Sequence, residues 1–231
     1  MSTSAHPVAP VPPFTSRRWP KALALGAVLF VAAAFVFKYV FHYYLHYNEA
    51  AFNDPAAGAA NYWRMRGWLL LHISSGMTAA LIGPWQFSQR LRKRYLQLHR
   101  LSGRVYVIAV MCGCVGALGL AIGTTFGKAW GFGVAMLAFA WFTTTSMAYY
   151  AVRQRQIQIH REWMVRSYVV TFAFVTFRIF NDYPPMKNWL PDADRANVMI
   201  WACWALPLLV TEVILQLKRM PRPQNLAVRE K

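Results

Sequence analysis

The residues best suited to chemistry are histidines and arginines that lie inside or beside long apolar runs. They are His72 and Arg178 within such runs, and His99, Arg100, His160 and Arg161 at the edges of two others. Charged groups inside a bilayer are costly and usually face the protein interior or water, so they are candidates for function. Imidazole can ligate haem iron, and guanidinium can hold a carboxylate through two hydrogen bonds. This chemistry suits haem b or a quinone.

His72 and Arg178 define a candidate outer site. His72 lies shortly after the start of one apolar run and Arg178 lies near the end of another, so both reach a similar depth. We predict that they face a shared polar cavity in the outer leaflet. The alternatives are a hydrogen-bonded packing role for His72 and an ion pair between Arg178 and Asp182, one turn later. Lys38, near a helix end, is expected to snorkel towards water.

A candidate inner site comes from a repeated Gln-x-His-Arg pattern. The pattern contributes His99 and Arg100 before one apolar run, and His160 and Arg161 before another. If these runs are neighbours, His99 and His160 could be axial ligands of one haem iron, with the arginines holding the propionates. The alternative is that both pairs bind lipid phosphates or fix the loops.

Other polar residues inside apolar runs have structural interpretations. Glu212 is expected to be a counter-charge for a basic residue on a neighbouring run: Arg104, Arg166 or His160. A polar seam is expected along the run that carries Trp141, Thr143, Thr144 and Thr145.

Composition places these residues in a membrane. The 231 residues are 57% hydrophobic and only 14% charged, and the apolar runs are about 20 residues long, as a spanning helix requires. The formal net charge is +17, but the basic residues lie between the apolar runs instead of clustering on a soluble face. The charge therefore sets topology, and nucleic-acid binding is excluded.

Several enzyme and metal classes are also excluded. Cys112, Cys114 and Cys203 fall inside apolar runs and form no CxxC pattern, which argues against disulfides and a zinc site. There is no nucleophile with a base, no Gly-rich phosphate loop and no HExxH motif, which argues against hydrolases and nucleotide enzymes.

The pattern predicts an all-α integral membrane protein, a bundle of six transmembrane helices. A Pro-rich disordered tail (1–19) and a basic tail (218–231) flank the membrane domain (20–217), and the first span is not a cleaved signal peptide. Because most of the 25 Lys and Arg residues fall on one side, both termini are expected in the cytoplasm. The predicted spans are 20–44, 67–87, 105–124, 130–152, 167–182 and 198–217.

Two finer features concern packing. The similar basic loops indicate an internal two-helix repeat, in which spans two and three match spans four and five. In span three, small residues recur at helical spacing and predict close approach of a neighbouring helix: Gly113, Gly116, Gly119 and Gly123.

Sequence blocks within the predicted spans and basic loops resemble a known bacterial family. The blocks are LHISSG (71–76), GPWQF (83–87), LHRLSGRVY (98–106) and HREWMVRSY (160–168), followed by Arg178. They resemble the predicted membrane proteins catalogued as domain of unknown function 2306, over residues 67–180. The resemblance implies a multi-pass fold in the bacterial inner membrane and implies no activity. A looser similarity is to six-span cytochromes of the b561 type, although only His72 lies well inside a span here.

The leading functional hypothesis is an inner-membrane redox-type protein that binds haem b or a quinone among spans two to five. Membrane lipids surround it, and a membrane redox or assembly partner is conceivable. The alternative is a non-enzymatic binding, transport or assembly protein, whose polar residues line a path for a small anion or contact a partner complex.

Overall fold

The structure is a computed structural model that describes residues 19–53, 62–182, 185 and 190–220. Within these ranges the side chains of residues 19–22, 182, 192 and 193 are not described. The predicted tails fall almost entirely outside the described residues. All regular elements in the described part are helical, so the all-α prediction is confirmed there.

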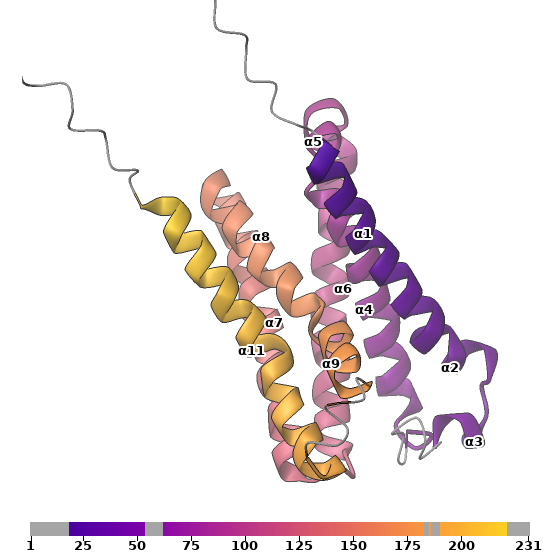
Figure 1. The fold of residues 1–231 in the computed structure, drawn as a ribbon. Coiled ribbons are helices and arrows are strands. Elements are labelled where there is room, and N and C mark those ends of the chain that lie inside the picture. Colours follow the sequence, from indigo (N-terminus) through magenta and orange to yellow (C-terminus); the bar gives the residue numbers. More distant parts are fainter. Residues whose placement is uncertain (1–18, 54–61, 183–184, 186–189, 221–231) are drawn as a thin grey trace, which may run out of the picture.

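The helices follow one another in an up-and-down order (Figure 1). Their bounds are α1 Trp19–Phe35, a π-helical segment η1 Val36–Val40, α2 Phe41–Leu45, α3 Glu49–Phe52, α4 Arg66–Gln86, α5 Gln89–Arg94, α6 Leu96–Gly123, α7 Lys128–Arg153, α8 Ile157–Thr171, α9 Ala173–Asp182 and α11 Asp192–Arg219.

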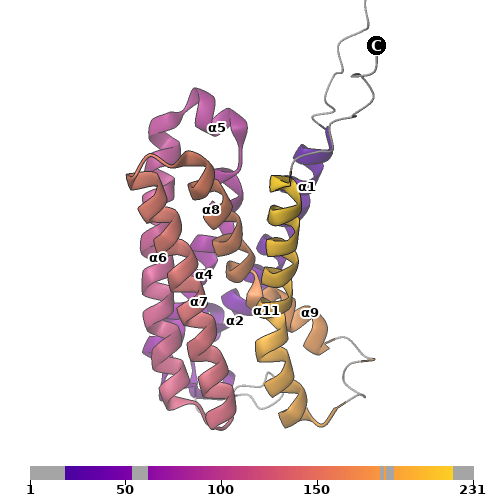
Figure 2. The same ribbon diagram turned by 90° about the vertical axis from the view of Figure 1, so that its left-hand side faces the viewer.

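The bundle is built from two tightly packed pairs, α4 with α6 and α7 with α8, joined by contacts between α6 and α7. Helix α11 lies against α7, α8 and α9, and α1 with η1 lies against α4. Figure 2 shows α5 and the turn between α7 and α8 at one end of the bundle. The start of α1 and the end of α11 lie at this same end, which we call the α5 end (Figure 1).

Five helical stretches are long and apolar enough to cross a membrane, so the chain is a multi-pass helical membrane protein. They are Leu23–Leu45, Leu96–Gly123, Lys128–Arg153, Ile157–Asn181 and Asp194–Arg219. Helix α4, the predicted second span, has 21 residues but also carries His72, Ser74, Ser75 and Thr78. These polar groups lower its hydropathy, and α4 is not among the five.

The helices extend further than the predicted spans. We predicted basic loops before the third and fifth spans, but α6 already begins at Leu96 and α8 at Ile157. The physical reason is that Gln, Arg and Leu are good helix formers, so the helices continue beyond the apolar core. The two His-Arg pairs therefore lie on the first turns of α6 and α8.

The glycine face of α6 allows α4 to approach closely, as predicted. A Cβ added to Gly116 would lie 2.8 Å from the backbone N of His72 and 2.9 Å from the backbone O of Trp68. Such distances are shorter than ordinary contacts, so a side chain at this position would push the two helices apart. Gly116 thereby sets the position of His72 relative to α6.

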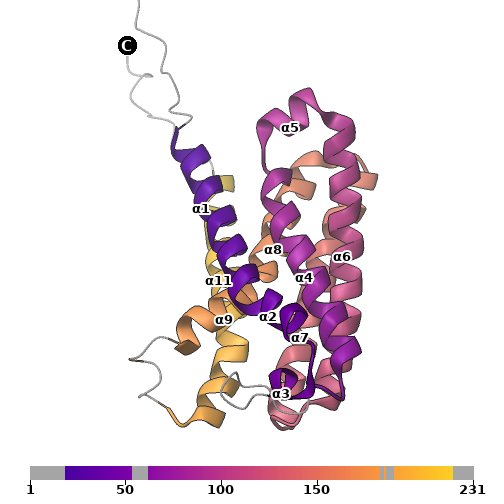
Figure 3. The ribbon, with the colours of Figure 1, turned by 90° about the vertical axis from the view of Figure 1, so that its right-hand side faces the viewer.

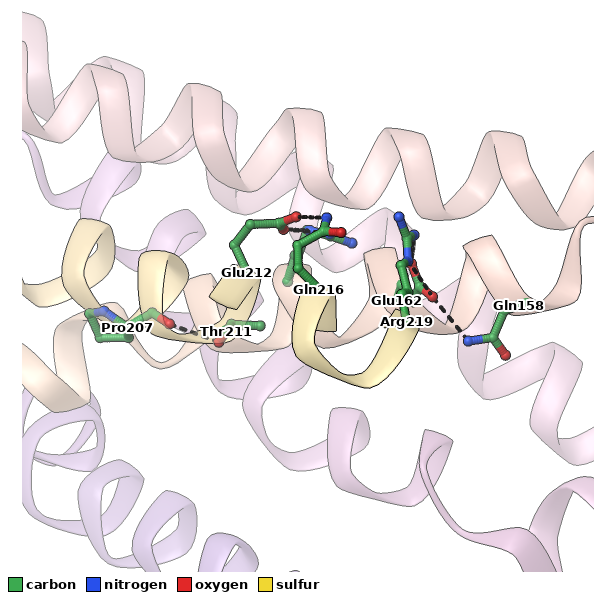
Figure 4. A network of polar contacts seen from close by, with 8 residues as sticks. Gln158, Glu162, Pro207, Thr211, Glu212, Gln216 and Arg219 are labelled. Carbon is green, nitrogen blue, oxygen red and sulfur yellow. Dashed lines mark hydrogen bonds and ion pairs between the residues drawn. The ribbon is translucent and has the colours of Figure 1, made fainter. Parts of the chain in front are cut away.

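Two ion pairs connect α8 to α11 (Figure 4). Nε and one terminal nitrogen of Arg166 donate to the same oxygen of Glu212, at 2.9 and 2.5 Å. One turn nearer the α5 end, Arg219 binds Glu162, which also accepts a hydrogen bond from Gln158 at 3.0 Å. The predicted counter-charge role of Glu212 is confirmed, with Arg166 as its partner.

Candidate functional site

A cavity of about 660 Å³ lies in the half of the bundle away from the α5 end. Residues of α4, α6, α7 and α9 line it. Segments η1 and α2, which lie beside α4 in Figure 3, close the remaining face. Much of the wall is aromatic or aliphatic, including Phe35, Leu69, Trp130, Leu137 and Phe174.

His72 lines this cavity from α4. Its Nδ1 lies 2.9 Å from the backbone oxygen of Gly113 on α6. Because a carbonyl oxygen only accepts, Nδ1 must carry the hydrogen, and Nε2 of the neutral ring is left as an acceptor or a metal ligand. The ring centroid lies 6.4 Å from that of Trp141 and 5.9 Å from that of Phe174, edge-on to both.

Two cationic side chains, Lys38 of η1 and Arg178 of α9, line the same cavity. Nζ of Lys38 lies 4.8 Å from the ring centroid of Tyr39, and the guanidinium carbon of Arg178 lies 5.2 Å from it. The tyrosine ring therefore brings together two cations from different helices through cation–π contacts. No carboxylate is among the described residues that line the cavity, and the two charged side chains among them are both cations.

His72 and Arg178 line the same cavity, as predicted. Its location in the outer leaflet stays a prediction. The pairing predicted for Arg178 with Asp182 concerns a side chain outside the described residues. Lys38 was expected only to snorkel. It is exposed, and it also lines the cavity.

His42 of α2 adds a second imidazole to the wall. Its Nε2 is buried and has no hydrogen-bond partner among the described residues. Its ring lies against His46 and Tyr43, with centroid distances of 5.0 and 5.5 Å. A buried polar atom without a partner is uncommon in folded proteins and often marks a place for water or a ligand.

Tyr62, just before α4, completes the polar wall. Burial, followed by the effect of neighbouring Tyr43, raises the pKa of its phenol to about 12, while the charge of Arg178 acts in the opposite direction. The hydroxyl therefore stays protonated at neutral pH and can donate a hydrogen bond.

Two irregular helix segments among the described residues border this cavity. Helix α1 continues into the π-helical turn Val36–Val40, which carries Lys38 and Tyr39. The fifth long helix is interrupted at Phe172, between α8 and α9, and Thr171, Ala173 and Phe174 all line the cavity. π-Helical turns and broken membrane helices occur often at functional sites.

A network of hydroxyl groups connects three helices beside the cavity. The hydroxyl of Tyr106 lies 2.8 Å from that of Ser167 and 2.9 Å from that of Thr171. Nε1 of Trp141 donates to the Thr171 hydroxyl at 2.9 Å, and the Thr145 hydroxyl lies 2.7 Å from that of Ser167. The predicted polar seam is thus confirmed at Trp141 and Thr145.

The other sequence-predicted site residues lie at the α5 end, away from the cavity. His99 is within electrostatic range of Arg92, Arg100 and His160. Nδ1 of His160 donates to the backbone oxygen of Ala148 at 2.9 Å, whereas Nδ1 of His99 is buried with no partner among the described residues. The structure therefore gathers the predicted residues into two groups, at opposite ends of α4 and α6.

Comparison with known families gives one match, to the predicted membrane proteins of domain of unknown function 2306, over residues 69–215. The chain belongs to this family. No curated protein and no solved structure matches it.

The match to the DUF2306 family runs from α4 into α11, further along the chain than the blocks of the resemblance. It includes His72, Arg178 and all four predicted residues of the α5 end. The cavity wall formed by η1 and α2 precedes the matched region, so Lys38, Tyr39 and His42 lie outside the match.

Tyr39 and Tyr62 both line the cavity and were not singled out by the sequence analysis. Tyr39 follows Lys38 directly, but it stands among several aromatic residues at the end of the first predicted span and carries no signal of its own. Tyr62 lies in a polar stretch between apolar runs and carries no sequence signal for burial. A burial estimate for each face of the first span would have been needed to find Tyr39.

Proposed function

We propose that this DUF2306 protein binds a membrane quinone in the cavity around His72. The observation that supports the proposal is the combination of a neutral imidazole acceptor with two cations inside an aromatic cavity. The volume of about 660 Å³ lies in the range of sites for small organic ligands.

The residues suit the reduced form, the quinol, in particular. Nε2 of His72 would accept the hydrogen bond of one quinol hydroxyl, because its Nδ1 hydrogen is held by Gly113. Lys38 and Arg178 would stabilise negative charge that develops on the quinol oxygen as its proton moves to His72. The rings of Trp141 and Phe174 would contact the apolar face of the quinol.

Haem b is a second candidate ligand, favoured by the unpartnered Nε2 of His42. His72 and His42 would be the axial ligands, and Lys38 and Arg178 would bind the propionates. His72 has the hydrogen bond from Nδ1 to a backbone carbonyl that metal-bound histidines usually show.

The axial pair predicted from sequence, His99 and His160, is a less suitable haem site. His160 has a ligand-like hydrogen bond from Nδ1 to Ala148. His99 has no such partner for Nδ1 among the described residues, so ligation through Nε2 would leave a buried N–H group unsatisfied. We therefore place haem, if it binds, in the cavity.

Passive binding or transport of a small anion is the remaining alternative. It is favoured by the positive charge of the cavity and by the absence of a carboxylate among its described lining residues. In this case Lys38 and Arg178 would hold the anion, and the membrane redox partner would not be needed.

The setting we propose is the bacterial inner membrane, with α4 as a sixth span and both termini in the cytoplasm. It is supported by the basic residues around α5 and by the common location of the start of α1 and the end of α11 (Figure 1).

The deciding experiment uses the protein purified in mild detergent, in two measurements. Addition of a short-chain ubiquinone or menaquinone analogue should quench tryptophan fluorescence, because Trp130 and Trp141 line the cavity. Absorption spectra of the oxidised and reduced protein should show no stoichiometric Soret band. A stoichiometric Soret band that disappears in both His72→Ala and His42→Ala would show that the cavity ligand is haem and not a quinone. Binding of chloride or a carboxylate, without binding of the quinone analogue, would favour the anion.

A further inference from the structure

A second group of polar residues lies at the α5 end, far from the proposed quinone cavity. Five basic side chains from three helices gather there: Arg92 of α5, His99 and Arg100 of α6, and His160 and Arg161 of α8. We call them the basic cluster. Four of its members are the two His-Arg pairs predicted from the sequence. Arg92, the fifth member, was not predicted to belong to this site.

The cations of the basic cluster act on one another. Arg92 is half-buried, and burial together with the neighbouring charge of Arg161 lowers the pKa of its guanidinium. His99 is within range of Arg92, Arg100 and His160. Holding like charges together in this way is unfavourable unless an anion offsets the repulsion.

The carboxylate next to Arg161 in the sequence does not serve this purpose. Glu162 follows Arg161 directly, but its side chain is buried and binds Arg219 and Gln158 (Figure 4). The charges that act on His99 and Arg92 most are those of other cations. The basic cluster thus has no carboxylate of its own among the described interactions.

The local backbone adds to the positive potential. Helices α6 and α8 both begin at this end, and neither has a side-chain cap on its first turn. Free N–H groups and helix dipoles favour anions at such positions. Nδ1 of His99 is also buried without a partner among the described residues, although a ring nitrogen that carries hydrogen requires an acceptor.

We propose that the basic cluster binds a phosphate group, either in the headgroup of an anionic phospholipid or in a soluble phosphate ester. The arginines provide two-pronged donors for its oxygens, and His99 provides a further donor. The position at the ends of the spans is where lipid headgroups lie. This proposal is independent of what binds in the quinone cavity.

The test compares two double variants with the same change of net charge. Arg92→Gln with Arg161→Gln removes two members of the cluster, and Lys93→Gln with Arg155→Gln removes two exposed cations outside it. Native mass spectrometry would count phosphatidylglycerol retained by each protein in detergent, and phosphorus NMR would measure binding of inorganic phosphate and glycerol 3-phosphate.

The first double variant should bind the phosphate-bearing ligand about tenfold more weakly or worse, whereas the second should match the wild type. Retained phosphatidylglycerol with no binding of the soluble phosphates would identify a lipid site, and the reverse would identify a soluble ester. Equal loss in both double variants, or no loss in either, would overturn the proposal.

Two further measurements separate loss of binding from loss of fold. The single variant His99→Ala removes one donor without removing a fixed charge, and it should also weaken binding. Quinone-analogue binding, measured in the same samples, should not change in any of these variants. Failure of quinone binding in the wild type would bear only on the cavity, and the comparison of the phosphate variants would remain valid.

Discussion

Nδ1 of His72 lies 2.9 Å from the backbone oxygen of Gly113, across the contact between α4 and α6. This hydrogen bond fixes both the tautomer of the ring and the direction of Nε2. The proposed role of His72 depends on Nε2 being an acceptor, so removal of the imidazole should weaken ligand binding.

Replacement His72→Leu should weaken binding of a quinol analogue by about tenfold or more, because a hydrogen bond to the ligand is lost inside an apolar cavity. Fluorescence titration of the purified variant would measure it. The control is His46→Leu, since His46 is exposed and is not part of the cavity wall. Equal affinity of the two variants would rule out His72 as a ligand-binding residue.

Two glycines on α4 allow a test of the cavity that leaves every polar residue in place. A Cβ on Gly67 or Gly76 would meet nothing within 4 Å, but only Gly76 lines the cavity. Gly76→Leu should block ligand binding with little loss of stability, and Gly67→Leu should leave binding unchanged. Ligand titration and thermal unfolding in detergent would measure both effects.

The opposite pattern is expected at Gly116, where a side chain would meet the backbone of α4. Gly116→Leu should lower the unfolding temperature or abolish folding. If Gly76→Leu behaved in the same way as Gly116→Leu, the cavity beside Gly76 would not exist in the native protein.

The ion pair between Arg166 and Glu212 should show strong coupling. The Arg166 side chain is only 10% exposed, so Glu212→Leu would leave a nearly buried guanidinium without its counter-charge. We expect a loss of about 3 kcal/mol for this single variant and a much smaller loss for Arg166→Leu with Glu212→Leu. Denaturation of the single and double variants would provide the coupling energy.

A suitable control for this cycle is Gln216→Leu. Gln216 is exposed and donates to the other oxygen of Glu212, so its removal should cost about 1 kcal/mol or less. If the stability losses of Arg166→Leu and Glu212→Leu simply added up in the double variant, the ion pair between these two side chains would be contradicted.

Titration of Tyr62 tests whether this side chain lies beside Arg178. In the folded protein its pKa is raised to about 12, so its proton is held more tightly than in the unfolded chain, where tyrosine titrates near pH 10. This contribution to stability is complete below pH 10 and is lost as the pH rises towards 12. Tyr62→Phe should remove both this loss and the corresponding ultraviolet absorption change.

Arg178→Leu provides the complementary test, because the charge of Arg178 lowers the Tyr62 pKa. Removing it should move the titration to still higher pH. A Tyr62 titration that did not respond to Arg178→Leu would show that the two side chains are not neighbours.

The proposed topology can be tested by cysteine labelling of intact cells, in a background without Cys112, Cys114 and Cys203. Cysteines at Asn53 and Asp194, at the end away from α5, should react with an impermeant reagent added outside. Cysteines at Lys93 and Gln156, at the α5 end, should react only after the membrane is opened. The reverse pattern would invert the orientation, and labelling of Asn53 and Lys93 from the same side would exclude α4 as a span.

The sequence was sufficient for the features that depend on composition and charge. Long apolar runs predicted a helical membrane protein, the glycines of α6 predicted its contact with α4, and Glu212 was correctly expected to need a basic partner. His72 and Arg178 were found because polar groups within apolar runs are rare and must face the interior. These arguments require only the position of a residue along a helix.

The wall formed by η1 and α2 could not be predicted in this way. The first span is apolar on all sides, so its sequence does not show which face meets the bundle. The π-helical turn Val36–Val40 also adds a residue to one turn, which rotates all later side chains about the helix axis. The inward position of Tyr39 and His42 depends on that turn.

The tight contact between α4 and α6 has a consequence for how the chain enters the bilayer. Helix α4 is not among the helices apolar enough to cross a membrane, and it carries a histidine whose hydrogen bond is completed only by Gly113 of α6. We expect α4 to wait at the translocon until α6 has been synthesised, and both to insert together as a hairpin. The glycines of α6 would therefore matter during biogenesis, before any ligand is bound.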